Sequence, residues 1–169
     1  MDDHRFPLRE KRRRMDQEQV LAELIESWVS LALEYSDGAP DLTRIFVYAA
    51  SERDRTYANV FFEQDGSVIY ASELRGVDAD PDRTVAVQRF LLKDLKAAET
   101  RLRELGAPVP TQYRVAYDTV IRQLDMQLSH EPMYANHPAK IMEEGAEDWL
   151  DGRLRKIFGD DDAPAPNGN

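Results

Sequence analysis

The 169-residue chain contains no cysteine. Disulfide bonds, thiolate zinc sites, iron–sulfur clusters and cysteine nucleophiles are therefore excluded. A chain of this length can bury most of its apolar surface without such cross-links, so we expect one domain with an ordinary hydrophobic core. The absence of cysteine also fits a reducing compartment.

Long apolar segments are missing as well. The apolar stretches are short and interrupted by charged residues, whereas a membrane-spanning helix needs roughly 20 apolar residues. The basic cluster near the N-terminus is not followed by the apolar region of a secretory signal. We therefore expect no membrane association and a cytoplasmic location.

The sequence also lacks the motifs of common catalytic and nucleotide-binding sites. Its eight glycines are scattered and form neither a G-x-G-x-x-G motif nor a P-loop. There is no G-x-S-x-G elbow, and Ser129 and His130 are neighbours in an extended segment, where successive side chains point to opposite faces. We therefore predict that the protein is not an enzyme and needs no cofactor.

Two of the histidines, His130 and His137, lie in one irregular segment near Asp125. Two histidines and one carboxylate are the ligands of a facial metal triad, but the spacing matches no metal motif. We predict no metal site, and a small metal-assisted enzyme using these three residues stays a third hypothesis.

Charge is distributed unevenly along the chain. The net charge is −10, residues 1–15 carry +3, and the remainder therefore carries −13. An acidic body repels nucleic acid phosphates and attracts cationic surfaces. This pattern predicts a basic protein partner and no nucleic acid, while charge that only maintains solubility is the simpler alternative.

Hydrophobic periodicity predicts an α+β fold in the order α-β-β-β-α-β-β-α. Helical spacing of apolar residues indicates three helices, and alternation between Gly- and Pro-containing turns indicates five strands. The strands form a three-stranded antiparallel meander and a C-terminal hairpin packed against the helices. The predicted helices are 16–35, 84–105 and 139–158, and the predicted strands are 45–50, 57–63, 68–72, 112–117 and 121–129.

Residues 16–158 are predicted to form a single domain. The charge-dense segment 1–15 is predicted to be a disordered basic arm, and 159–169 a disordered acidic tail. Asp16 is the predicted N-cap of the first helix, and Asp65-Gly66 is the strongest hairpin-turn signal. Both faces of the meander are fairly apolar, so helices should cover one face and another segment should partly cover its back.

The candidate partner-binding residues lie in two loops. The acidic loop 73–83 contributes carboxylates that can meet a basic partner. The proline-flanked segment 130–138 contributes an aromatic residue predicted to be exposed, of a type favoured at interface hot spots, and an amide. The candidates are Glu73, Asp78, Asp80, Asp82, Tyr134 and Asn136.

Several segments in order resemble the YezG-like immunity proteins of bacterial polymorphic toxin systems. They are a Trp-bearing first helix containing Ile25 and Trp28, the aromatic meander FVYAASERDRTYANVFFEQDGSVIY, the helix FLLKDLKAAETRLRELG and the hairpin with its Tyr-containing loop LDMQLSHEPMYANHP. The resemblance spans roughly residues 16–149. It implies a non-catalytic cytoplasmic protein that binds a nuclease-type toxin domain and blocks it.

Two function hypotheses follow. The leading hypothesis is an immunity protein that binds and neutralises a cognate toxin domain. The alternative is a small adaptor or regulatory domain of unknown partner, perhaps homodimeric through the apolar back of the meander. The sequence leaves the oligomeric state and the partner's identity open.

Overall fold

A five-stranded antiparallel sheet forms the centre of the molecule, in the strand order β3-β2-β1-β4-β5. The computed structural model describes residues 6–53, 55–134, 141–150, 152–155 and 157. The strands are β1 (Leu42–Glu52), β2 (Arg55–Gln64), β3 (Ser67–Tyr70), β4 (Gln112–Asp118) and β5 (Gln123–Ser129). The predicted order of elements and the α+β class are confirmed.

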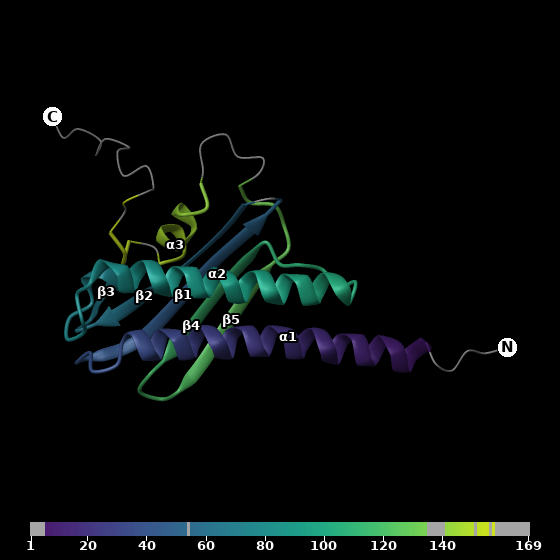
Figure 1. Ribbon diagram of the computed structural model, residues 1–169, viewed down its shortest axis with the longest axis horizontal. Helices are drawn as coiled ribbons and strands as arrows, with labels where there is room; N and C mark the ends of the chain where they lie inside the picture. The colour runs from purple at the N-terminus through teal and green to yellow at the C-terminus, as the bar shows by residue number, and fades with distance from the viewer. Residues whose placement is uncertain (1–5, 54, 135–140, 151, 156, 158–169) are drawn as a thin grey trace.

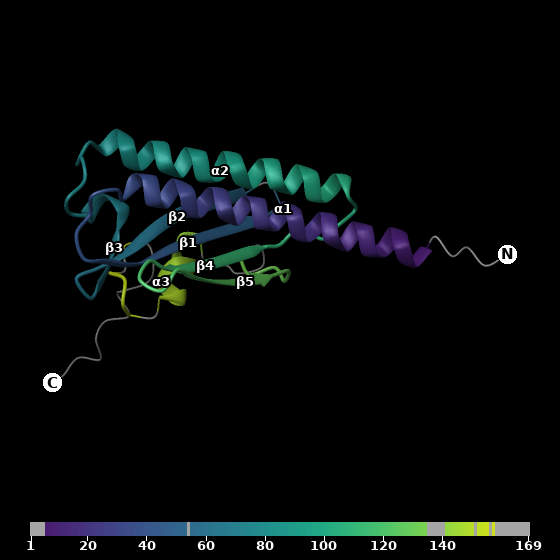
Figure 2. The same ribbon diagram turned by 90° about the horizontal axis from the view of Figure 1, so that it is seen from below.

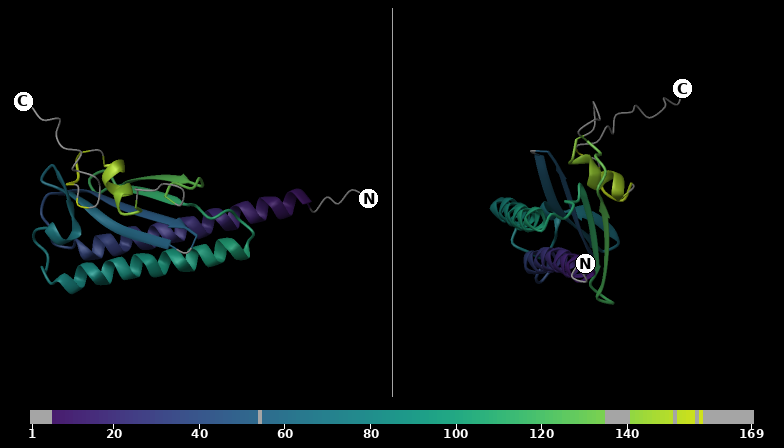
Figure 3. Two further views of the ribbon diagram at one scale, coloured as in Figure 1. Left: turned by 90° about the horizontal axis from the view of Figure 1, so that it is seen from above. Right: turned by 90° about the vertical axis from the view of Figure 1, so that its right-hand side faces the viewer.

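Two long helices, α1 (Phe6–Tyr35) and α2 (Pro81–Glu104), lie side by side on one face of the sheet (Figures 1 and 2). The short helix α3 (Glu144–Trp149) lies on the other face, as the end-on view in Figure 3 shows. A single 3₁₀ turn, η1 (Ala71–Glu73), connects β3 to the loop before α2. No helix among the described residues has the length and apolar character needed to cross a membrane.

The central strand β1 is buried on both faces because its side chains alternate between two cores. Ile45, Val47 and Ala49 pack under α1 and α2, and Phe46 and Tyr48 pack under the segment around α3. Trp28 anchors the helix side, where it is fully buried and meets Tyr113 edge to face with ring centroids 5.5 Å apart. The expectation that both faces of the meander are covered is therefore confirmed.

Two turns have the backbone conformations that the sequence indicates. Asp65 and Gly66 both have positive φ, at 50° and 77°, which a tight hairpin turn between β2 and β3 requires. Gly106 has a φ of 65° directly after the C-cap of α2, where a left-handed residue ends a helix.

The prediction of a disordered basic arm is wrong for the part of it that the structure describes. Helix α1 begins at Phe6, not at Asp16, so residues 6–15 are helical. They are mostly strong helix formers, and Pro7 lies in the first turn, where its missing N–H is not needed. Residues 1–5 and the predicted tail at 159–169 lie outside the described residues.

The predicted extent of the final helix is wrong, and two sets of apolar residues are exposed. The final helix is limited to Glu144–Trp149 within the described part of 139–158, and Gly152 has a φ of 74° that helix geometry does not allow. Phe90 is exposed on α2 although it belongs to the apolar residues of this helix, of which Val87 and Leu91 are buried. The apolar face of β5 is also largely exposed, because this edge strand lies beyond the cover of the helices: Leu124 is 48% and Met126 38% exposed.

Candidate partner-binding site

One end of the molecule is made of three loops that are far apart in the sequence. They are the α1–β1 loop 36–41, the β2–β3 turn 65–66 and the loop 74–80 before α2, all at the end opposite the N-terminus (Figure 1). Gln64 joins two of them, since its amide nitrogen donates to the Pro40 and Arg75 carbonyls, each at 2.9 Å, and its oxygen accepts from the Arg75 N–H at 3.0 Å. The Asp65 N–H donates to the Asp41 carbonyl at 3.1 Å and so connects the β2–β3 turn to the α1–β1 loop.

Six exposed carboxylates gather on these loops and the adjoining first turn of α2. They are Asp37, Asp41, Asp65, Asp78, Asp80 and Asp82, and we call this surface the acidic end. None of the six forms an ion pair with any residue that the structure describes. Their charge is therefore directed to solvent, where it can attract a cationic surface.

Two of these carboxylates are held in fixed positions by the backbone. Asp80 caps α2 by accepting a hydrogen bond from the Asp82 N–H, and Asp78 accepts one from the Asp80 N–H, both at 3.0 Å. Asp78 and Asp80 thus have a structural role as well as an exposed charge. A partner would find these acceptors already ordered, which reduces the entropy lost on binding.

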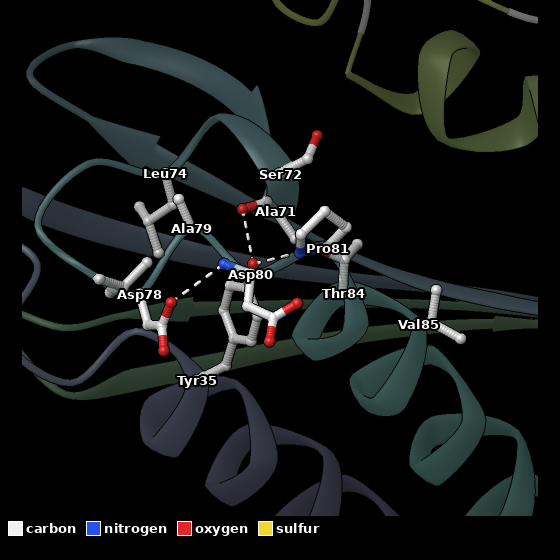
Figure 4. A pocket seen from close by; sticks show the side chains of 11 residues that line it. Tyr35, Ala71, Ser72, Leu74, Asp78, Ala79, Asp80, Pro81, Thr84 and Val85 are labelled. Atoms are coloured by element: carbon white, nitrogen blue, oxygen red, sulfur yellow. Dashed lines mark hydrogen bonds between the residues drawn. The ribbon is translucent and has the colours of Figure 1, made fainter.

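A shallow cleft of about 380 Å³ opens beside Asp78 and Asp80 (Figure 4). Its floor includes Tyr35, whose hydroxyl donates to the Ala71 carbonyl at 2.8 Å. The guanidinium of Arg83 lies 4.5 Å from the centre of the Tyr35 ring and donates to the Asp78 carbonyl at 2.7 Å. The rim of the cleft is acidic, whereas the Tyr35 ring is covered by Arg83 and stacks on Phe62, with ring centroids 5.7 Å apart.

The other predicted contact residues fall elsewhere. Glu73 is exposed but lies 3.7 Å from the guanidinium of Arg155, so its charge is partly compensated. Tyr134 was predicted to be exposed and is buried at 8% exposure, which removes it from any exposed interface. Asn136 lies outside the described residues.

Tyr134 is buried because its polar groups form hydrogen bonds with Tyr48 and Glu52 of β1. Its hydroxyl lies 2.6 Å from the Tyr48 hydroxyl, and its N–H donates to the Glu52 carboxylate at 3.0 Å. Burial and the Tyr134 hydroxyl raise the pKa of Tyr48 above its ordinary value. This network attaches the segment after β5 to the face of the sheet that carries α3. The aromatic residues of this face are therefore explained by packing, without a binding role.

Sequence reasoning missed half of the acidic end. Asp37, Asp41 and Asp65 are in loops distant from 73–83, and only the tertiary structure brings them together. A weak signal was present, because each lies in or beside a turn, and Asp41 and Asp65 have positive φ values of 58° and 50°.

The histidine–carboxylate hypothesis receives no geometric support from the part of the chain that can be inspected. Across residues 6–53, 55–134, 141–150, 152–155 and 157, no three His, Asp or Glu side chains are close enough to hold a metal ion. His137 lies outside these ranges, so the full set of His130, His137 and Asp125 stays untested. The carboxylates of the acidic end are spread over a surface, which suits recognition of a basic protein surface better than chelation of one ion.

No protein-family model matches the chain, and no curated protein sequence matches it either.

Proposed function

We propose that this protein is a non-catalytic, cytoplasmic binding protein, an immunity protein that neutralises a nuclease-type toxin domain through the acidic end. The observation that supports the proposal is the set of six exposed carboxylates that form no ion pair with any described residue, at an end of the molecule where Gln64 joins two loops. Nuclease domains bind phosphates through basic surfaces, and an acidic protein surface is complementary to them. The YezG-like resemblance supports the same proposal.

The alternative is a regulatory adaptor that dimerises through the back of the meander. That face is covered, because Met142, Ala146, Leu150 and Leu154 pack on it. A dimer there would first have to displace these residues, so the observations favour the acidic end as the contact surface.

The test is direct binding and protection from toxicity. We expect the gene next to the one for this chain to encode a long protein with a basic, nuclease-like C-terminal domain. That domain is the probe, immobilised at low and at physiological salt. We expect the full chain to bind it, to inhibit its nuclease activity and to restore growth on co-expression. Opposite charges steer association, so the association rate should fall steeply as salt increases.

A charge-neutralising variant tests the surface. Asp37→Asn, Asp65→Asn and Asp78→Asn together keep the turn and hydrogen-bonding geometry, since Asn tolerates positive φ and accepts the same bonds. We expect the association rate at low salt to fall by about tenfold or more. A control with the same charge change, Glu104→Gln, Asp125→Asn and Glu131→Gln, lies on other exposed parts of the chain and should have a smaller effect. Equal effects of the two variants, or no binding by the unaltered chain, would refute the proposal.

A further inference from the structure

A second surface, unrelated to the acidic end, lies between α1 and the edge strand β5. It is an apolar groove of about 470 Å³, with Ala22 and Val29 on the α1 side and Leu124 and Met126 on the β5 side. Strand β5 is the last strand of the sheet, and its outer edge pairs with no other described strand. Proteins normally cover such apolar surfaces and strand edges, so we expect another segment to bind in the groove.

Helix α1 carries an apolar stripe that continues the groove towards the N-terminus. Leu8, Met15, Ala22 and Val29 recur every seven residues and therefore lie along one side of the helix. This stripe is separate from the buried face that contains Leu24 and Trp28. Its C-terminal half lines the groove, whereas Leu8 and Met15, in its N-terminal half, are 69% and 60% exposed.

Within the described residues, the first turns of α1 pack against no other element. Figures 1 and 2 show this part of the helix running past the sheet and past the end of α2. Every residue from 7 to 15 is exposed, and none of them makes a side-chain hydrogen bond or ion pair with the described chain. A helical segment of this length gains little stability in water by itself, and most helices depend on packing of an apolar face.

The charges along α1 are separated into a basic N-terminal part and an acidic C-terminal part, which indicates what kind of segment fits the groove. Residues 6–15 carry five basic side chains and one acidic, a net +4, and residues 16–35 carry five acidic side chains and no basic one, a net −5. Two copies of such a helix repel each other when parallel and attract each other when antiparallel. A two-fold axis perpendicular to the helices brings two copies together in this antiparallel orientation.

We propose that the chain forms a two-fold symmetric homodimer in which residues 6–15 of each copy fill the α1–β5 groove of the other. Matching the two stripes places Met15 against Ala22 of the second copy and Leu8 against Val29 of the second copy. Lys11 and Arg12 then lie beside Glu26 of the second copy, an exposed carboxylate at the groove without an ion pair among the described residues. This inference does not depend on the proposed toxin-binding function, because it concerns a different surface.

Light scattering after size exclusion, with sedimentation equilibrium, tests the dimer on the purified full chain. We expect a species of twice the 19.4 kDa chain mass at micromolar concentration. Met15→Glu should weaken dimerisation by about a hundredfold, because it places a charge in an apolar contact. Val85→Glu, an equivalent change at a 53%-exposed position on α2, should leave the dimer intact.

Charge reversal separates this pairing from any other dimer. Lys11→Glu with Arg12→Glu should weaken dimerisation by about fivefold or more, and Glu26→Lys should weaken it too. Combining the three changes should restore it, since opposite charges face each other again. Arg9→Glu with Arg13→Glu changes the charge equally on a side of the helix away from the stripe, and its combination with Glu26→Lys should give no rescue.

Each result of these experiments either supports or overturns the proposed dimer. A monomeric unaltered chain would overturn the inference, and so would a dimer that Met15→Glu leaves unchanged. Failure of the combined Lys11→Glu, Arg12→Glu and Glu26→Lys variant to recover affinity would show that the helices do not pair in this orientation. Circular dichroism distinguishes loss of the dimer from loss of the fold, because Met15 is exposed and its replacement should leave the core of the monomer unaffected.

Discussion

Replacing Gln64 by leucine would test whether the acidic end is a rigid structure. The Gln64 side chain is 1% exposed, and its amide makes three hydrogen bonds to the backbone of two loops. Leucine has a similar size but can neither donate nor accept. The Pro40 carbonyl and both backbone groups of Arg75 would therefore lose their partners.

The magnitude follows from those three bonds. A hydrogen bond contributes about 1 kcal/mol net, and a buried group left without its partner costs about 1–3 kcal/mol. Leucine recovers part of this by burying more apolar surface. The free energy of unfolding should fall by about 2–3 kcal/mol, which for a chain of this size lowers Tm by roughly 5–10 °C.

Urea denaturation followed by circular dichroism measures the free-energy change, and hydrogen exchange locates it. Exchange should accelerate in the loops 36–41 and 74–80, with β1 and β4 little affected in native conditions. Gln123→Leu, at an exposed position on β5, is the matched control and should change stability by no more than about 0.5 kcal/mol. A loss below that same limit for Gln64→Leu would refute the view that this amide holds the acidic end together.

Two further predictions concern the back of the sheet. A Cβ at Gly145 would overlap the hydroxyl groups of Tyr48 and Tyr134, so Gly145→Ala should lower the free energy of unfolding by about 1–3 kcal/mol in urea denaturation, and an unchanged midpoint would contradict this packing. Burial raises the pKa of Tyr57 to about 12, against about 10 in the unfolded chain. The neutral phenol is the form favoured by folding, so its contribution is complete below pH ~10 and is lost as the pH rises towards ~12. Stability measured across this range should fall and Tyr57→Phe should lessen the fall, whereas equal slopes for the two proteins would rule this linkage out.

The sequence by itself determined the type and order of the local elements, although not every boundary. The 3.6-residue spacing that runs to Leu105, and Gly106 after it, specified α2, because both signals act within a few residues of chain. The Asp65-Gly66 turn and the flanking alternation specified the β2–β3 hairpin in the same way. The two-faced apolar character of Ile45 to Ala50 indicated that β1 would be covered on both sides.

Tertiary structure decided what these elements would expose. Met126 has the alternation of a buried strand residue, yet it is 38% exposed because β5 is at the edge and α1 does not extend over it. Tyr134 lies in a polar, proline-flanked segment, yet it is buried, because it forms hydrogen bonds with the Tyr48 hydroxyl and the Glu52 carboxylate. Exposure depends on residues distant in sequence, and periodicity carries no information about them.

The same distinction applies to the binding surfaces. Composition showed that the body is acidic, and loop 73–83 was recognisable as part of the acidic surface. The acidic end required three loops to meet around Gln64, and the groove required α1 to cross the sheet beside β5. The sequence specifies which charges and apolar side chains the protein has, whereas the path of the chain decides which of them share a surface, because such surfaces are assembled from residues that only folding makes neighbours.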